Sequence, residues 1–280
     1  MKIKKYDYII YSASLAGVVF AIEKIKQDKK VLLLNQVGFP GGSITENLNI
    51  EQNIPSEINS EIIKIILLGI KNHCQGILYQ KNSQVILNPE AIKFILQKVL
   101  TEKGVDLLFH IRFNKIKKQE NTFSVSLIGR EGELHFECDN LIDASEEFIL
   151  SDLSKAVERE LLFRRYNLLT SFMKNEDVLN KDYIIGKIKL NDGRYWLSLK
   201  IEEKNELLYE HESHKIVEEL SYELFKNECR TQLLPIATQS LYRIEQKNEL
   251  PNFYILHKEL VAKYNRHKLI ELTDNLNFKE

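Results

Sequence analysis

The chain has 280 residues, of which 44% are hydrophobic and 28% charged, and its formal net charge is −1. A chain of this length can bury a large core in one domain or two. Its balanced charge excludes a broad basic face for nucleic acid, and no apolar run reaches the ~18 residues that cross a bilayer. The three cysteines fit neither a disulfide framework nor a metal site. We therefore expect a cytoplasmic protein.

The first 34 residues predict a strand, a helix and a second strand. Residues 6–11 are β-branched and aromatic, as in a buried parallel strand. Residues 15–28 carry apolar side chains at helical spacing, and residues 31–34 form another apolar run. A crossover unit of about 30 residues at the N-terminus is typical of dinucleotide-binding folds.

Helices and strands alternate through the next part of the chain. We expect helices at 57–71 and 89–102, the second beginning at Asn88-Pro89-Glu90, an extended segment at 77–87, and strands at 105–110, 121–129, 133–138 and 140–145.

The pattern changes after residue 150. The sequence predicts a helix over 151–175, a hairpin around Asn191-Asp192-Gly193, a long helix over 205–230 and a short strand near 251–260.

The first strand-to-helix turn is where a G-x-G-x-x-G fingerprint binds pyrophosphate, because missing side chains let the phosphates approach the backbone. Here the turn reads Ser12-Ala13-Ser14-Leu15-Ala16-Gly17, so only the third glycine is present. Asn35 stands at the end of the second strand, where an acidic residue binds the ribose. A neutral amide loses the charge-assisted bond, which is about twice as strong as a neutral one.

These residues, with Gly41-Gly42 and Thr45 beyond them, resemble the opening of FAD-dependent oxidoreductases with a glutathione-reductase-type dinucleotide domain. Three later segments are similar to that family in the same order: 87–113, which leads to a backbone contact on the adenine side at Ile111; 140–148, with Ala144-Ser145; and 239–256. The resemblance implies an α/β fold with an FAD/NAD(P)-binding Rossmann-like parallel sheet, built from residues 1–150 and 236–280. A smaller α+β region, 151–235, would be inserted as a substrate or partner region.

The cofactor-binding candidates carried over from the family are Ser12, Ser14, Gly17, Asn35, Gly41, Gly42, Ile111, Ala144 and Ser145. Several depart from its pattern, and Glu146 brings a carboxylate toward the pyrophosphate site, where like charge is unfavourable. The family's late glycine-rich segment has no counterpart, because His257-Lys258-Glu259 follows the last strand.

The departures favour a degenerate family member with no FAD or weak FAD, acting as an accessory or partner-binding protein, with a protein partner or a second copy of the chain. The alternative is an active FAD-dependent oxidoreductase with a small-molecule substrate. Arg243 is a candidate anion-binding residue for such a substrate, and a surface ion pair with Glu245 or Glu249 is the simpler interpretation.

Other candidates are weaker. His211 and His214 are spaced i,i+3 beside glutamates, but no matching second helix supports a metal site. Cys74 beside His73 lacks an orienting third group for nucleophilic catalysis. Arg164-Arg165 is interpreted as solvated surface charge, and Trp196 as core.

Overall fold

The structure, a computed structural model, describes residues 3–170, 177–202, 205–226, 233–257 and 269–274. The chain forms two compact units, Met1–Arg159 with Ile244–Glu280, and Glu160–Arg243. The division falls later at both ends than the expected insertion of 151–235. The reason is that the long strands β10 (Val157–Thr170) and β13 (Leu233–Gln246) each have residues in both units.

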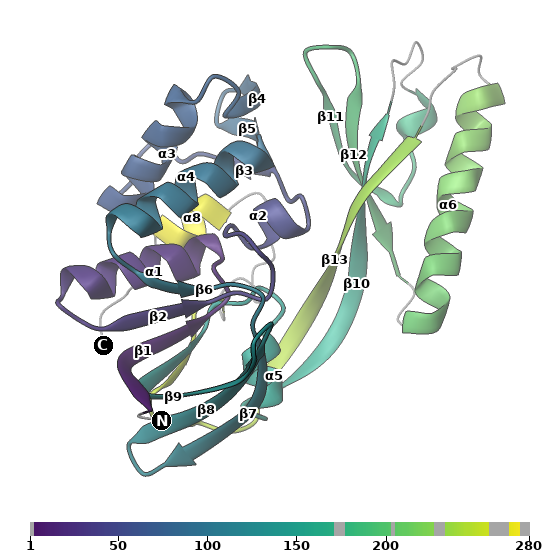
Figure 1. The fold of residues 1–280 in the computed structure, drawn as a ribbon. Helices are drawn as coiled ribbons and strands as arrows, with labels where there is room; N and C mark the ends of the chain where they lie inside the picture. The colour runs from purple at the N-terminus through teal and green to yellow at the C-terminus, as the bar shows by residue number, and fades with distance from the viewer. Residues whose placement is uncertain (1–2, 171–176, 203–204, 227–232, 258–268, 275–280) are drawn as a thin grey trace. The chain divides into compact units, whose positions relative to one another are not determined.

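A seven-stranded sheet forms the centre of the first unit, in the order β6-β2-β1-β9-β8-β7, with β14 paired to β9 (Figure 1). The β6, β2, β1, β9 and β14 pairings are parallel, whereas β7, β8 and β9 pair antiparallel. This confirms the α/β class and the Rossmann-like sheet. The strands are β1 (Lys4–Tyr11), β2 (Val31–Leu34), β6 (Asp106–Leu108), β7 (Arg112–Gln119), β8 (Thr122–Gly129), β9 (Gly132–Asp143) and β14 (Phe253–Ile255).

Helices in the first unit follow the predicted apolar spacing. Helix α1 (Leu15–Lys26) buries Val18, Val19 and Ile22 completely. Helix α3 is Glu61–Asn72, and α4 is Pro89–Glu102 with the Asn88 side chain accepting from the Glu90 amide. A small antiparallel sheet is made of β3 (Glu51–Asn53), which precedes α3, and of β4 (Ile77–Lys81) and β5 (Gln84–Leu87), which lie between α3 and α4 in the sequence.

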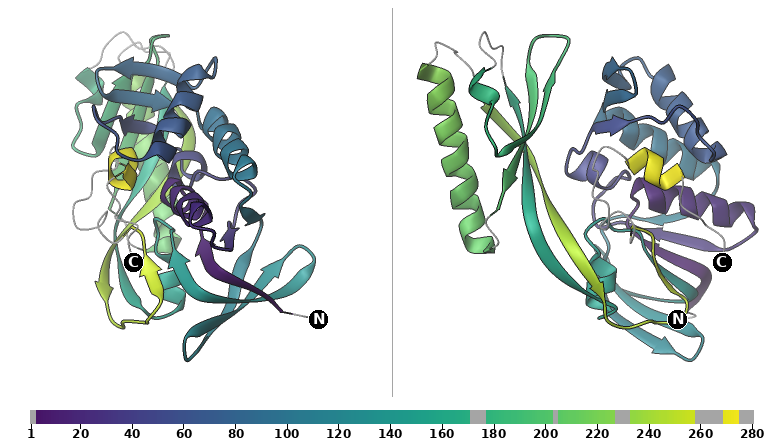
Figure 2. Two further views of the ribbon diagram at one scale, coloured as in Figure 1. Left: turned by 90° about the vertical axis from the view of Figure 1, so that its left-hand side faces the viewer. Right: turned by 180° about the vertical axis from the view of Figure 1, so that it is seen from behind.

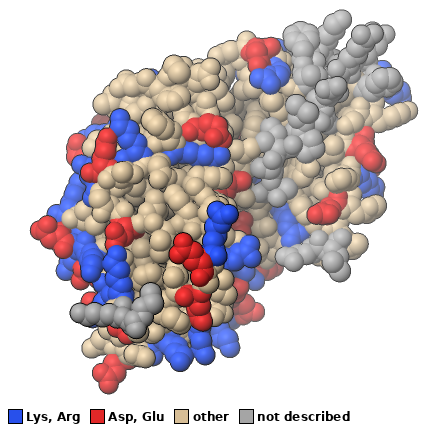
Figure 3. All heavy atoms as spheres, viewed as in Figure 1, with Lys and Arg blue, Asp and Glu red and all other residues tan. Residues whose placement is uncertain are grey.

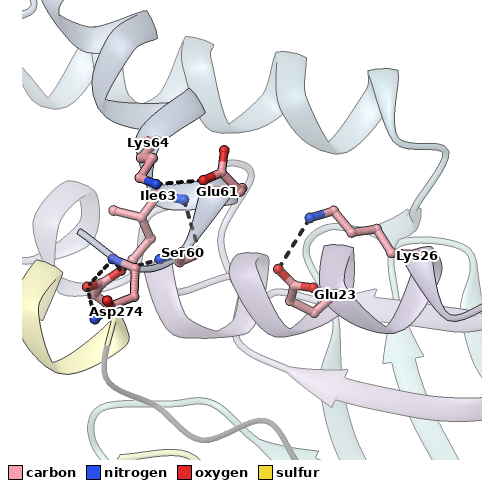
Figure 4. A network of polar contacts seen from close by, with 8 residues as sticks. Glu23, Lys26, Ser60, Glu61, Ile63, Lys64 and Asp274 are labelled. Carbon is pink, nitrogen blue, oxygen red and sulfur yellow. Dashed lines mark hydrogen bonds and ion pairs between the residues drawn. The ribbon is translucent and has the colours of Figure 1, made fainter.

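The short C-terminal helix α8 (Leu269–Asp274) is fixed to the start of α3 through one carboxylate (Figure 4). Asp274 accepts from the Asn59 amide at 2.9 and 3.0 Å and from the Ser60 amide at 2.7 Å. The Ser60 hydroxyl in turn accepts from the Ile63 amide at 3.3 Å and caps α3. A carboxylate at exposed helix-start amides makes charge-assisted bonds, so the contact ties distant parts of the chain together.

The second unit contains a four-stranded sheet and a long helix (Figure 2). The strand order is β11-β12-β10-β13, where β11 is Ile184–Lys189 and β12 is Tyr195–Ile201. Helix α6 (Glu206–Lys226) packs Leu220 and Leu224 into the core that this sheet forms. The predicted hairpin and helix are present, and residues 227–230 of the predicted helix lie outside the described residues.

The helix predicted over 151–175 is wrong. A five-residue helix α5 (Ile149–Leu153) is followed by β10, which pairs antiparallel with β12. Leu, Arg and Glu in this segment are good helix formers, but cross-strand pairing overrides that preference. The two strands predicted at 133–138 and 140–145 are one strand, β9.

Arg164 and Arg165 are also misassigned by the sequence. They are 6% and 2% exposed, because successive residues of β10 point to opposite faces of a sheet whose faces are both buried at this point. The Arg164 guanidinium lies 4.4 Å from the centre of the Tyr209 ring, and Arg165 donates to Gln239.

Lys and Arg are interspersed with Asp and Glu on the face drawn in Figure 3. This agrees with the near-zero net charge. Among the described helices, none is long and apolar enough to span a membrane.

Candidate functional site

The carboxyl ends of three parallel strands meet beside the first strand-to-helix turn. Tyr11 at the end of β1 pairs in register with Leu34 of β2 and with Asp143 of β9. Open α/β sheets bind ligands in the crevice outside these ends, where the strand order reverses. A cavity of about 170 Å³ lies there, lined in part by Ser12, Asn35, Gly42, Ser43, Glu46, Ser145, Glu146 and Glu147.

The two serines that replace the fingerprint glycines differ in what they do. Ser12 has a φ of 78°, the left-handed conformation that glycine adopts without strain. Ser14 is fully buried and caps α1, its hydroxyl accepting from the Gly17 amide at 3.1 Å and donating to the Ala144 carbonyl at 2.7 Å. Ser12 therefore adopts the backbone conformation that favours glycine, whereas the Ser14 side chain caps α1 and ties it to Ala144.

We expect Ser12→Gly and Ser14→Ala to change stability in opposite directions. Glycine at position 12 removes left-handed strain and, after the added chain entropy, raises the free energy of unfolding by less than about 1 kcal/mol. Alanine at position 14 removes a helix cap and lowers it by about 1–2 kcal/mol. Urea unfolding of both variants measures this, and equal destabilisation by the two substitutions would contradict the assignment.

Gly17 is the one fingerprint glycine that remains, and the packing around it leaves no room for a side chain. A Cβ built there would lie 2.2 Å from the Ser12 carbonyl oxygen and 3.0 Å from the Ala144 Cβ. This agrees with its expected role in close packing of helix, turn and neighbouring strand.

Asn35, the residue at the ribose position, is 2% exposed and fully engaged. Its side-chain oxygen accepts from the Ala13 amide at 3.0 Å, and its nitrogen donates to the Phe39 carbonyl at 2.7 Å and to Glu46 at 3.2 Å. Burial raises the pKa of Glu46, partly offset by that hydrogen bond. The Ile111 amide, expected on the adenine side, donates to the Asn35 carbonyl at 3.1 Å.

The Gly41-Gly42 loop lies directly on the first turn. The Gly41 amide donates to the Ala13 carbonyl at 2.7 Å, and a Cβ at Gly42 would be 2.8 Å from the Ser14 Cβ. The Glu146 carboxylate accepts from the Ser43 amide at 3.1 Å, at the start of the short helix α2 (Ser43–Glu46). The Glu146 carboxylate therefore occupies the Ser43 N–H, the backbone donor beside the first turn.

Asp143 directly precedes Ala144 and Ser145, and its carboxylate is completely buried. It accepts from the amide and hydroxyl of Ser145 at 2.9 and 2.5 Å, and from the amide and hydroxyl of Ser151 at 2.6 Å each. Burial raises the pKa of Asp143, and these hydrogen bonds oppose that rise. The amide and the hydroxyl of Ser145 are therefore both bonded to Asp143 inside the protein.

Sequence reasoning assigned no role to His257, which is 3% exposed just after β14. Its Nε2 lies 3.4 Å from the Ser14 hydroxyl, and the ring also hydrogen-bonds the Ala144 carbonyl. Burial lowers the pKa of His257 to about 4 from 6.5, against that hydrogen bond. The imidazole is therefore neutral at pH 7 and packs behind the first turn.

His257 makes stability depend on pH in a defined window. The unfolded chain takes up a proton below pH 6.5 and the folded chain only near pH 4, so stability is lost as the pH falls between these values. The full loss is about 3 kcal/mol. Chemical denaturation at pH 7 and pH 4 should show a smaller loss in His257→Gln than in the parent. The exposed His135 gives the control His135→Gln, and equal losses in all three proteins would contradict the prediction.

The residues at this turn do not fit an FAD pyrophosphate in the arrangement described. The Asn35 side chain and the amides of Gly41 and Ser43 are bonded within the chain. The cavity of about 170 Å³ is smaller than ordinary small-molecule sites. Glu46, Glu146 and Glu147 all line it, and three carboxylates repel a diphosphate.

The remaining candidates lie elsewhere. Arg243 is in the second unit, and its side chain is 68% exposed. It forms an ion pair with Glu160 at 3.7 Å, in place of the expected pair with Glu245 or Glu249. Cys74 is exposed beside His73 in the sequence, and no base contacts its thiol within the described residues. The described part of the chain contains no group of His, Cys, Asp and Glu that could hold a metal ion, His211 and His214 included.

Comparison with protein families gives one match, to the model described as FAD dependent oxidoreductase, over residues 7–159. A comparison with curated protein sequences gives no match.

Solved structures with the same fold include hydroxylases and a flavoprotein, by their titles. Anhydrotetracycline hydroxylase OxyS from Streptomyces rimosus superposes with a TM-score of 0.63 at 11% identity, covering 95% of this chain and 60% of that one. Aklavinone-11 hydroxylase in a ternary complex with FAD and aklavinone gives 0.58 at 13%, covering 91% and 57%. A flavoprotein/dehydrogenase from Cytophaga hutchinsonii gives 0.62 at 15%, covering 99% and 81%.

The chain thus spans under two thirds of the two hydroxylases, and identities this low support the fold alone. The family match covers more than half of the 280 residues and includes most of β1, the first turn, β2 and β9. The chain belongs to the FAD-dependent oxidoreductase family.

Proposed function

We propose that this protein is a family member whose own side chains close the dinucleotide-binding turn, so that FAD binds weakly at best and the scaffold serves as an accessory or partner-binding protein. The observation that carries the proposal is the hydrogen bond from the Ser43 amide to the Glu146 carboxylate. Gly42 beside it packs so closely on Ser14 that a Cβ at position 42 would lie 2.8 Å from the Ser14 Cβ. The Glu146 carboxylate then occupies a backbone N–H beside the turn that would otherwise be open to a phosphate oxygen.

The second unit, Glu160–Arg243, exposes few large apolar side chains in its described part that could form the partner surface predicted for the inserted region. Among its described residues, the large apolar side chains that are exposed are Leu208 and Tyr222, both on α6. They are about four helical turns apart, so they do not form one patch. In the first unit, Ile65 and Leu68 are exposed about one turn apart on α3, and Phe94 is exposed on α4.

The second candidate is an active FAD-dependent oxidoreductase acting on a small molecule. The family match and the hydroxylases among the structural neighbours favour it. In that case the Gly41-Gly42 loop would have to separate from the turn, breaking the Gly41–Ala13 and Ser43–Glu146 bonds.

A restoring experiment tests the proposal. The variant combining Ser12→Gly, Ser14→Gly, Asn35→Glu and Glu146→Gly should gain FAD binding by at least about tenfold over the parent, since one charge-assisted contact alone is worth that much. The same variant with Glu146 retained is the matched control and should gain less. Tight FAD binding by the unmodified protein would favour the active-enzyme alternative.

A further inference from the structure

A second cavity adjoins the closed turn and has a different lining. Its volume is about 410 Å³, within the range of small-molecule sites. It shares Tyr11, Gln36 and Ile149 with the smaller cavity. Its other walls come from the start of β7, from α5 and from Arg159 at the start of β10. All of its lining residues belong to the first unit.

The floor of this larger cavity is aromatic and aliphatic. Tyr11 and Phe113 make an edge-to-face pair with ring centres 5.1 Å apart, and Leu150 beside them is fully buried. The Tyr11 hydroxyl donates to the Gln36 side chain at 3.1 Å, which fixes the ring at the cavity wall. Such a surface suits a planar apolar group.

The charges at the cavity are positive in sum. Arg159 donates to Asp152 at 2.7 Å and to the Glu147 carbonyl at 2.7 Å, so its charge is balanced and its position fixed. The exposed Arg112 side chain has no hydrogen-bond or ion-pair partner within the described residues, and it lines the same cavity. One guanidinium is therefore available to a ligand, in a fork geometry that matches a carboxylate.

We propose that this cavity binds a small planar carboxylate, with Arg112 pairing with its carboxyl group and Tyr11 and Phe113 holding its apolar body. The proposal goes beyond the closed turn, because Arg112 and Phe113 take no part in closing it. The cavity of about 410 Å³ accommodates a benzoate-sized molecule.

Calorimetric titration with sodium benzoate, and with benzamide as its neutral analogue, tests this assignment. Benzoate should bind the parent protein at least about tenfold more tightly than benzamide, because only the carboxylate makes a charge-assisted bond. Arg112→Gln should remove that preference without changing the weak benzamide signal, and Arg112→Lys should keep part of it. Lys115→Gln removes a positive charge from the same strand outside the cavity and should leave benzoate binding unchanged.

Three outcomes would overturn the proposal. The first is that benzoate does not bind at concentrations up to about 10 mM. The second is that Arg112→Gln binds benzoate as tightly as the parent does. The third is that AMP binds more tightly than benzoate and displaces it, which would make the cavity a nucleotide site. Circular dichroism of each variant establishes that it is folded.

Discussion

Replacing Gly17 with leucine should leave the protein insoluble or unfolded. The Cβ alone would lie 2.2 Å from the Ser12 carbonyl oxygen, and this contact involves backbone that cannot turn away. Overpacking of a tight core commonly costs about 1–3 kcal/mol, and a backbone clash at the junction of β1 and α1 exceeds that range. The measurement is the soluble fraction on expression and the thermal midpoint of whatever is soluble.

Gly104 provides the matched control, because a Cβ there meets nothing within 4 Å. Gly104→Leu should cost only about 1–2 kcal/mol, from its left-handed φ of 72°. A soluble Gly17→Leu protein with an unchanged thermal midpoint would refute the packing role of Gly17.

Replacing Asp143 with alanine should lower the free energy of unfolding by roughly 3–5 kcal/mol. The substitution leaves the Ser145 and Ser151 amides, both buried, without their acceptor. The pKa of Asp143 is raised in the folded protein, so the fold binds its proton more tightly than the unfolded chain does and stability falls as the pH rises above 3.8. Asp143→Asn should remove this part of the pH dependence while keeping one acceptor oxygen.

The control for Asp143 is Asp139→Ala. Asp139 pairs with Lys5 at 2.8 Å with both side chains about half exposed, and such surface pairs contribute at most about 1 kcal/mol. Urea unfolding of both variants gives the comparison. Equal destabilisation would mean that the buried hydrogen bonds of Asp143 do not stabilise the fold.

The elements that the sequence predicted correctly are those in which one local pattern decides the structure. The apolar spacing of α1 and the uninterrupted apolar run of β2 each have a single interpretation. Strand β10 was predicted as helix because its Leu, Arg and Glu residues favour helices, and only pairing with β12 determines its form.

The candidate site shows the same limit. Ser12, Ser14 and Asn35 were found because they occupy positions in a local fingerprint. The contact of His257 with Ser14 joins residues 243 positions apart, and no local pattern signals it. Glu146 was recognised as a misplaced charge, but its bond to Ser43 depends on how two loops meet. Arg112 carries no motif and is distinguished only by the cavity that it lines.

The visible spectrum of the purified protein tests the central claim most directly. The account predicts a colourless protein, with no flavin absorbance released on denaturation and only weak binding when FAD is added. Three carboxylates and the internal bonds of Asn35 and Gly41 stand against the cofactor, and each lost contact costs about 1–3 kcal/mol, or roughly one to two powers of ten in affinity. A yellow protein carrying one FAD per chain would contradict the closed turn and establish the active flavoenzyme in its place.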